Sequence, residues 1–276
     1  MGQALELIGG QVTAPGATLT ALTMFNGNSA TVRNADLSSF VGLIDTFARN
    51  QAAGIMRIRS PKLHDNVQGL RFRIAAADPS PLFDDGVVQR LTPQDTLTLE
   101  LSGSAVGGQI EQAFYLIYYK DLPGTSAKFL TWADVAARTM NSWTTEIAIT
   151  PGVLGGFSGQ VPINASFDNF KANTEYALVG YRVDAACGAV RFTGPDFGNL
   201  GIGGPGMSTK NEWTNGWFKD MSVNLGIPLI PVFNAANKFG TLVDVASNQA
   251  GGAVNVTAIL HELAPVGVKG FSAGIS

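Results

Sequence analysis

The residues of this chain that could carry chemistry are few, and they do not gather in the sequence. The two histidines, His64 and His261, are each followed by an acid, Asp65 and Glu262, but neither pair has the HExxH spacing of a zinc site. We therefore expect each histidine to be a hydrogen-bonded surface or capping residue rather than a ligand. The sequence predicts no metal site and no cofactor.

Nucleophiles and paired acids are equally sparse. No serine lies in a GxSxG turn, the motif that exposes the nucleophile of α/β-hydrolases. Asp84 and Asp85 are adjacent acids in a segment after Pro81, where carboxylates are usually solvated turn residues. A glycosidase needs two carboxyl groups separated in space, which the sequence alone does not reveal. We predict no catalytic residue and a protein that is not an enzyme.

Two tryptophans are the side chains best suited to binding. Trp213 and Trp217 occur in the segment NEWTNGWF. At this spacing they could form a surface on which sugar rings stack. They could equally be buried anchors of a protein interface, where tryptophan is enriched. We favour the interface.

The segment 194–206, GPDFGNLGIGGPG, is conspicuously rich in glycine. It lacks the GxxxxGK[ST] motif that binds phosphate, and no evident strand–loop–helix unit surrounds it. We expect a long surface loop at a subunit contact. The candidate interface residues of this region are Phe197, Leu200, Ile202, Pro205, Trp213 and Trp217.

The composition points to a protein whose surface is covered by other subunits. Hydrophobic residues make up 45% of the chain and charged residues only 14%, against about 25% charged in a typical soluble protein. Charged residues normally cover exposed surface. The net charge of −3 gives no broad basic face, so we predict no sequence-specific nucleic-acid partner. The single cysteine, Cys187, excludes an internal disulfide, and we expect it to be buried.

Targeting signals are not evident in the sequence. The N-terminus lacks the basic start and apolar stretch of a signal peptide. Glu6 stands where a myristoylation motif needs Ser or Thr. No stretch approaches the roughly 18 apolar residues of a transmembrane helix. We expect a soluble protein made and assembled on the cytosolic side.

Hydrophobic periodicity predicts many short strands and few helices. The stretch FYLIYY at 114–119 is almost wholly apolar and predicts a central strand buried on both faces. Residues 1–16 contain two Gly- or Pro-rich dipeptides and predict an irregular arm. Residues 38–50 predict a short helix, because their apolar residues recur at i, i+3, i+4 and i+7. A second helix is predicted at 130–140. Strands are predicted at 17–25, 29–33, 54–59, 69–75, 96–101, 112–119, 143–150, 176–182, 188–193, 221–227, 229–233, 241–246 and 254–260.

The chain contains an internal echo. The segment GIMRIRSP, which begins at Gly54, resembles GAVRFTGP, which begins at Gly188, so that Arg57 matches Arg191 at an offset of 134 positions. A second echo joins residues 96–123 to residues 241–265, with the Gly-Gly pairs at 107 and 251 offset by 144 positions. Two echoes in the same order indicate a duplication.

A repeated unit of this length is the size of a domain. It exceeds the roughly 20–50 residues of a solenoid repeat and matches an ordinary domain. We therefore predict an all-β fold of two tandem antiparallel jelly-roll units with a few short helices. The predicted parts are an N-terminal arm (1–16), a first jelly roll (17–124), a second jelly roll (125–263, with a linker and helix at 125–142) and a C-terminal tail (264–276).

The two echoes, with the half-ending strands QAFYLIYYKDLP and VNVTAILHELAP, resemble one family in their arrangement. This family is the double jelly-roll major capsid proteins of tailless icosahedral viruses, including small phages with an internal membrane. The resemblance is architectural, covers about 17–263 and is not a close match of sequence. It implies a virion capsid protein assembled in the host cytoplasm. Homotrimers would form pseudo-hexameric capsomers, and the partners would be neighbouring capsomers, other virion proteins and an internal lipid membrane.

Two other classes stay open. A carbohydrate- or receptor-binding β-sandwich, such as a fibre or decoration module, would place Trp213 in an exposed cleft. An enzyme on a β-sandwich scaffold, such as a cupin, would need a cluster of histidine ligands, which two unrelated histidines do not provide. For a capsid subunit the candidate contact elements are the arm, the segment 194–206, the Trp213/Trp217 segment and the tail. The tail either becomes ordered on assembly or stays disordered.

Overall fold

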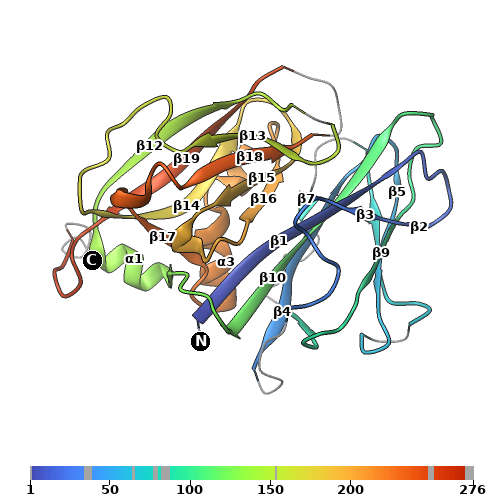
Figure 1. Cartoon of the computed structure of the whole chain (residues 1–276), viewed down its shortest axis with the longest axis horizontal. Coiled ribbons are helices and arrows are strands. Elements are labelled where there is room, and N and C mark those ends of the chain that lie inside the picture. The colour runs from blue at the N-terminus through green and yellow to red at the C-terminus, as the bar shows by residue number, and fades with distance from the viewer. Residues whose placement is uncertain are drawn as a thin grey trace.

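The computed structural model describes residues 2–33, 39–63, 66–76, 80–81, 88–152, 154–247 and 252–270. These residues form mainly β-strands, which are arranged in four sheets. Neighbouring strands within the sheets run antiparallel. Figure 1 shows two lobes, the first built by the N-terminal half of the chain and the second by the C-terminal half. The predicted all-β antiparallel class is confirmed.

The first unit consists of a large sheet, sheet A, and a small sheet, sheet B. Sheet A contains β1 (Gly2–Thr13), β3 (Thr23–Met24), β4 (Val41–Arg49), β7 (Ser80–Pro81), β8 (Gln89–Leu91) and β10 (Ile110–Leu122). Sheet B contains β2 (Thr20–Ala21), β5 (Gly54–Arg59), β6 (Leu70–Ile74) and β9 (Thr98–Leu101).

The second unit also has a large sheet, sheet C, and a small sheet, sheet D. Sheet C contains β11 (Phe129–Leu130), β12 (Thr139–Ile149), β14 (Glu175–Val183), β17 (Ile230–Asn234) and β19 (Val254–Leu263). Sheet D contains β13 (Phe157–Pro162), β15 (Cys187–Thr193), β16 (Ile202–Gly206) and β18 (Leu242–Ala246). The helical elements are α1 (Trp132–Arg138), α2 (Asn211–Thr214), α3 (Trp217–Leu225) and the 3₁₀ turns η1 (Pro195–Phe197) and η2 (Ala235–Asn237).

The two units share one strand order. The large sheets run β1-β10-β4-β8 and β12-β19-β14-β17, and the small sheets run β2-β9-β5-β6 and β13-β18-β15-β16. Each of these eight strands therefore has a counterpart at the same place in the other unit. The equivalent strands β4 and β14 both carry a register shift, β4 beside Leu43 and β14 between Leu178 and Gly180. This agreement is what a duplication predicts.

Both units also contain an ion pair at equivalent positions of their small sheets. Arg57 of β5 lies directly opposite Glu100 of β9, and Arg191 of β15 lies directly opposite Asp244 of β18. The closest N···O distances are 2.5 Å and 2.6 Å. The arginines are 134 positions apart and the acids are 144 positions apart, the same offsets as the two sequence echoes. The echoes therefore fall on equivalent strands.

Sheet A is buried on both of its faces. The layers follow the order C, D, A, B across the molecule (Figure 1). In β10 the odd residues of 113–119 belong to the core shared with sheet B, and the even residues belong to the core shared with the second unit. The prediction that FYLIYY is a central strand buried on both faces is confirmed.

The N-terminal segment is part of this central sheet. The prediction of an irregular arm at 1–16 is wrong for Gly2–Thr13, which form β1 between β3 and β10. Gly9 marks a close approach rather than a turn, because an added Cβ would lie 2.7 Å from the Phe25 ring and 2.8 Å from the Phe114 ring. The glycine leaves room for two aromatic rings.

The predicted helix at 38–50 is also wrong, because Val41–Arg49 form the strand β4. Every residue of β4 is buried, so apolar side chains occur on both faces and satisfy a helical spacing as well. The predicted strand at 221–227 is wrong as well, since α3 occupies Trp217–Leu225. The helix predicted at 130–140 is confirmed as α1, whose N-cap Thr131 and Asp134 form a capping box.

We expect Phe114→Ala to destabilise both units together. Phe114 stacks on Phe47 at a centroid distance of 5.1 Å and meets Phe157 of the second unit at 6.0 Å, edge to face. Truncation of a buried Phe costs about 3–5 kcal/mol of unfolding free energy. All four tryptophans lie in the second unit, so tryptophan fluorescence in a urea titration reports on the unit that is not mutated.

In Phe114→Ala, the urea midpoints measured by fluorescence and by far-UV circular dichroism should therefore both be lower than in the wild type, and they should coincide. The exposed Val106→Ala is the matched control and should leave both midpoints in place. A fluorescence midpoint that stays unchanged in Phe114→Ala, while circular dichroism shows two steps, would contradict a continuous core.

Candidate assembly interface

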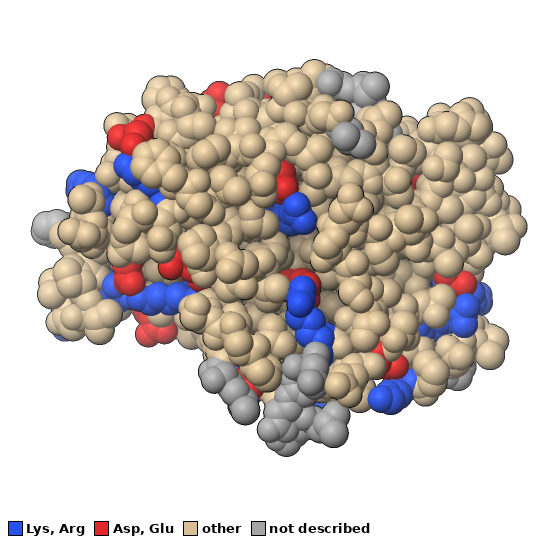
Figure 2. Space-filling model, viewed as in Figure 1, with Lys and Arg blue, Asp and Glu red and all other residues tan. Residues whose placement is uncertain are grey.

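The surface carries few charged groups, and many of these are paired. Figure 2 shows one face of the molecule on which most of the area is neither acidic nor basic. In the described parts of the chain, no group of three or more His, Cys, Asp or Glu is arranged to hold a metal ion. No helix of those parts is long and apolar enough to span a bilayer.

The histidine that the structure describes is hydrogen-bonded, as predicted. His261 lies on β19, with Nδ1 3.0 Å from the Thr139 hydroxyl and Nε2 3.2 Å from the Ser142 hydroxyl. Burial, and secondarily the charge of Lys219, lowers the pKa of His261 below its ordinary value. His64, Asp65, Asp84 and Asp85 lie outside the described residues.

Four of the six predicted interface residues have their side chains inside the chain. Phe197 and Ile202 are fully buried, and Pro205 is buried in β16. Trp217 is 5% exposed. Its Nε1–H donates to the Gly203 carbonyl at 3.0 Å. These side chains contribute to the core of the chain and leave no surface for a partner.

The other two predicted residues keep some exposed surface. Leu200 is half-buried and packs against the core of the first unit. Trp213 is 43% exposed, and the Lys210 ammonium lies 5.3 Å from its ring centroid. Because Trp217 meets Phe47 of β4 in the core, the two tryptophans do not form one stacking surface. The hypothesis of a paired sugar-binding surface is therefore wrong, and Trp213 alone keeps an interface role as a prediction.

The glycine-rich segment is a strand over part of its length. The prediction of a surface loop at 194–206 is wrong for Ile202–Gly206, which form the buried strand β16. An added Cβ at Gly203 would lie 2.0 Å from the Val190 carbonyl, and one at Gly204 would lie 2.5 Å from the Trp217 indole. The glycines let strands and indole approach closely. The small residues Gly203 and Gly204, close in the sequence to Trp217, are the features that could have predicted this packing.

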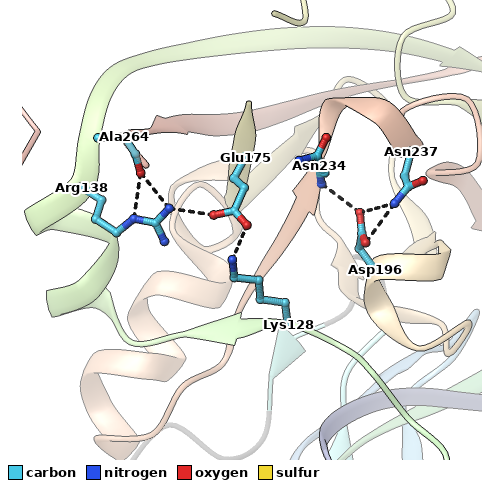
Figure 3. A network of polar contacts seen from close by, with 7 residues as sticks. All are labelled: Lys128, Arg138, Glu175, Asp196, Asn234, Asn237 and Ala264. Atoms are coloured by element: carbon cyan, nitrogen blue, oxygen red, sulfur yellow. Dashed lines mark hydrogen bonds and ion pairs between the residues drawn. The ribbon is translucent and has the colours of Figure 1, made fainter. Parts of the chain in front are cut away.

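A charged network fixes the junction between the linker, α1 and the tail (Figure 3). Glu175 of β14 accepts hydrogen bonds from Lys128 and, at 2.7 Å, from Arg138. Arg138 also donates from Nε and Nη2 to the carbonyl of Ala264, at 2.9 Å and 2.7 Å. One carboxylate therefore joins three segments that are distant in the sequence, including the first residue of the predicted tail.

A second polar cluster lies beside it (Figure 3). The Asp196 carboxylate accepts from the backbone N–H of Asn234 at 2.8 Å and from the Asn237 side chain at 2.9 Å and 3.0 Å. The backbone N–H of Lys128 donates to the Asp196 carbonyl at 3.0 Å. The two networks share Lys128 and hold η1 and η2 against the linker.

The described part of the tail is packed on α1. Ala264 is buried, and the N–H of Gly270 donates to the Ala137 carbonyl at 2.9 Å. Between them Val266 and Val268 are exposed. Residues 271–276 lie outside the described residues. The tail therefore begins as an ordered segment that presents two apolar side chains.

Two exposed aromatic residues lie on loops of the second unit that an ion pair joins. Phe167 and Phe239 are 58% and 66% exposed. The loops that carry them are tied by Lys238, whose ammonium lies 2.5 Å and 2.6 Å from the Asp168 carboxylate oxygens. The two loops come from different parts of the chain, and no local pattern in the sequence indicates that they meet. Both rings therefore expose apolar area to solvent.

Comparisons with known proteins add little. No family model and no curated protein matches the chain. Among solved structures the chain is similar to the PBSX exported protein XepA, at 12% identity over 93% of this chain and 86% of that chain, with a TM-score of 0.28. It is similar to the major capsid protein P2 of Bacteriophage PM2, at 8% identity over 96% and 100%, with a TM-score of 0.26.

A third similarity is to the T=1 particle of Penaeus vannamei nodavirus, at 12% identity over 96% of this chain and 99% of that chain, with a TM-score of 0.23. Likenesses with such low identities and TM-scores carry no argument about function. The chain itself is a pair of all-β units with one strand order.

We expect Glu175→Gln to destabilise the protein in a pH-dependent way. Burial opposes ionisation of Glu175, but the hydrogen bonds from Lys128 and Arg138 outweigh it and hold its pKa below the ordinary value. A carboxyl group with a lowered folded pKa stabilises the fold above its unfolded pKa, about 4.3, and loses that effect as the pH falls through the folded pKa. At pH 7 the loss should be about 1–3 kcal/mol of unfolding free energy.

The measurement is urea unfolding of both proteins at pH 7 and again in acid. The difference should shrink below about pH 4, where the wild-type carboxyl group becomes protonated as well. Lys120→Gln, which removes one charge at an exposed position of β10, is the control and should change little. An equal difference at every pH would show that the ionised carboxylate is not what stabilises this junction.

Proposed function

We propose that the protein is a non-enzymatic structural subunit of a viral capsid, which builds a shell by self-association. The observation that carries the proposal is the duplicated β unit, in which both halves have the same strand order and an equivalent ion pair. Each half has eight matched strands in two antiparallel sheets, which is the make-up of a jelly roll. Two tandem jelly rolls are the architecture implied by the family resemblance of the sequence.

The way in which the units pack supports assembly. Within the chain, the large sheet A of the first unit lies against the small sheet D of the second unit. This contact is head-to-tail, because it joins a large sheet to a small one. It leaves a small sheet, B, at one end and a large sheet, C, at the other. Head-to-tail contacts form a ring when the rotation closes and a filament when it does not.

A ring of three chains would contain six similar units. Such a homotrimer has a pseudo-hexameric outline and could tile a closed icosahedral shell with neighbouring capsomers. The low charge of the chain fits this arrangement, since charged residues are depleted in the core of protein interfaces. In this proposal the other partners are further virion proteins and a lipid membrane beneath the shell.

The alternative function is a carbohydrate- or receptor-binding module of a virion. The exposed ring of Trp213 favours it, because an exposed aromatic face can stack on a sugar or anchor a partner. In that case the protein would not need to associate with itself. The two functions therefore differ in what the loss of Trp213 changes.

The proposal predicts a homotrimer in solution. Light scattering on a size-exclusion column should give a mass of three times 28.9 kDa, and negative-stain images of the same peak should show hexagonal outlines or shells. If the capsid function is correct, Trp213→Ala should lower this mass, because the exposed Trp213 ring is then an anchor of the interface. A monomer that shows no concentration dependence would contradict the capsid proposal. Loss of glycan binding in Trp213→Ala, with no effect on mass, would support the alternative.

A further inference from the structure

The outer face of sheet B is unusually basic for this chain. Met56 and Ile58 of β5 are fully buried against sheet A, so the alternate residues of the strand point outward. Arg57 and Arg59 are two of these. Arg71 lies directly opposite Arg57 on β6 and shares its face. Arg73, two residues further along β6, points to the same side. We call these four arginines the arginine face.

Among the described residues, the arginine face has fewer acids than arginines. On the described strands of sheet B its acid is Glu100, which lies 2.5 Å from Arg57 and 3.1 Å from Arg59. Arg71 and Arg73 are exposed and have no ion-pair partner among the described residues. Like charges directly opposite one another in a sheet are destabilising. In the described part of sheet B, four arginines and one glutamate thus leave an excess of positive charge, in a chain whose net charge is −3.

In the second unit, the face that is equivalent to the arginine face is covered by the first unit. The equivalent pair, Arg191 and Asp244, lies on sheet D at the junction between the units. The Arg191 guanidinium lies 4.0 Å from the centroid of the Phe157 ring. Phe157 in turn meets Phe25 of the first unit edge to face, at 5.7 Å. In the second unit this face is therefore packed against the large sheet of the other unit. By the duplication, the arginine face is placed to receive another large sheet.

The free large sheet of the chain is sheet C, and its outer face offers acids. A hollow of about 310 Å³ lies there between α1, α3 and β19. Glu212 and Asp220 line it and are exposed. Glu146 of β12 is exposed on the same outer face, because its neighbour Ile147 points into the core.

Two cations on the outer face of sheet C already have local partners. Lys219 lies 3.4 Å from Asp220, and Arg182 donates to the Asn215 side chain at 2.9 Å. His261, which also lines the hollow, has a lowered pKa. Lys210 is a third cation here, because its ammonium lies beside Trp213. These groups are therefore balanced in charge, and the exposed acids Glu146, Glu212 and Asp220 offer partners to the arginine face.

We propose that the arginine face of one copy of this chain docks on the outer face of sheet C of the next copy, with Arg71 and Arg73 set toward Glu146, Glu212 and Asp220. This inference rests on the proposed capsid function and specifies which surfaces meet in its oligomer. The contact joins a small sheet to a large one, as the packing of sheet D on sheet A does within the chain, but here α2 and α3 lie on β14 of the large sheet and take part in it. Complementary charge at such a contact selects the partner surface and disfavours pairing of like faces.

A charge-swap series tests the docking, with mass by light scattering as the readout. Arg71→Glu with Arg73→Glu should weaken association by at least about tenfold, because the introduced acids then face the acids of sheet C. Glu212→Lys with Asp220→Lys should do the same, because both faces are then basic. The chain that carries all four substitutions should regain the wild-type mass, since its faces are again opposite in sign.

The control carries an equal change of charge at two exposed basic residues of sheet A, Lys120→Glu with Arg90→Glu, and should keep the wild-type mass. Far-UV circular dichroism and melting temperature confirm that each variant is folded. A wild-type monomer would contradict the proposed function itself. A wild-type oligomer that survives Arg71→Glu with Arg73→Glu would leave the capsid proposal intact and overturn the docking.

Two further results would also overturn the docking. One is a folded four-substitution chain that stays dissociated, since the arginines would then meet a different surface. The other is loss of binding to phosphatidylserine vesicles by the arginine variant with no change in mass, which would assign the arginine face to a membrane.

Discussion

The burial of sheet A on both faces is the constraint on which the rest of this structure depends. Successive residues of β10 point alternately into two cores, so Phe114 packs toward the second unit while Tyr115 packs toward sheet B. A strand of this kind cannot face water on either side. The two units are therefore joined through apolar side chains rather than by a flexible tether, and the faces left open are fixed as the outer sides of sheets B and C.

The equivalent ion pairs of the two units lie in different surroundings. Arg191 and Asp244 lie at the junction between the units, where burial first raises the pKa of Asp244 and the bond to Arg191 opposes that rise. Arg57 and Glu100 lie on the outer face of sheet B, and there the hydrogen bonds from the arginines outweigh burial and lower the pKa of Glu100. The two pairs are buried to a similar degree, since the arginine side chains are 14% and 16% exposed. Arg191 lies against Phe157 at the junction between the units, whereas Arg57 donates to the Val67 carbonyl of its own unit.

The sequence predicts those features that a local pattern encodes. The stretch 114–119 is apolar at every position, and the two echoes predict the duplication with which the strand orders agree. Glycine is a misleading signal for turns in this chain. Gly9 lies against two aromatic rings and Gly203 against the Val190 carbonyl, so both allow close packing within strands. The sequence also misleads at β4, whose two buried faces imitate a helical period. Trp217 could not be assigned to the core, because its partner Phe47 is remote in the sequence. The sequence does not show that Arg57 and Arg71 share a face, because this follows from the register between β5 and β6.

The central claim is that the packing of one unit on the next continues from chain to chain. The measurement that tests it most directly is a cryo-electron microscopy reconstruction of the purified oligomer, at a resolution that separates sheets about 10 Å apart. The account predicts threefold symmetry with six lobes in a ring, and with sheet B of each chain facing sheet C of its neighbour. A twofold particle, in which sheet B faces sheet B or sheet C faces sheet C, would contradict it.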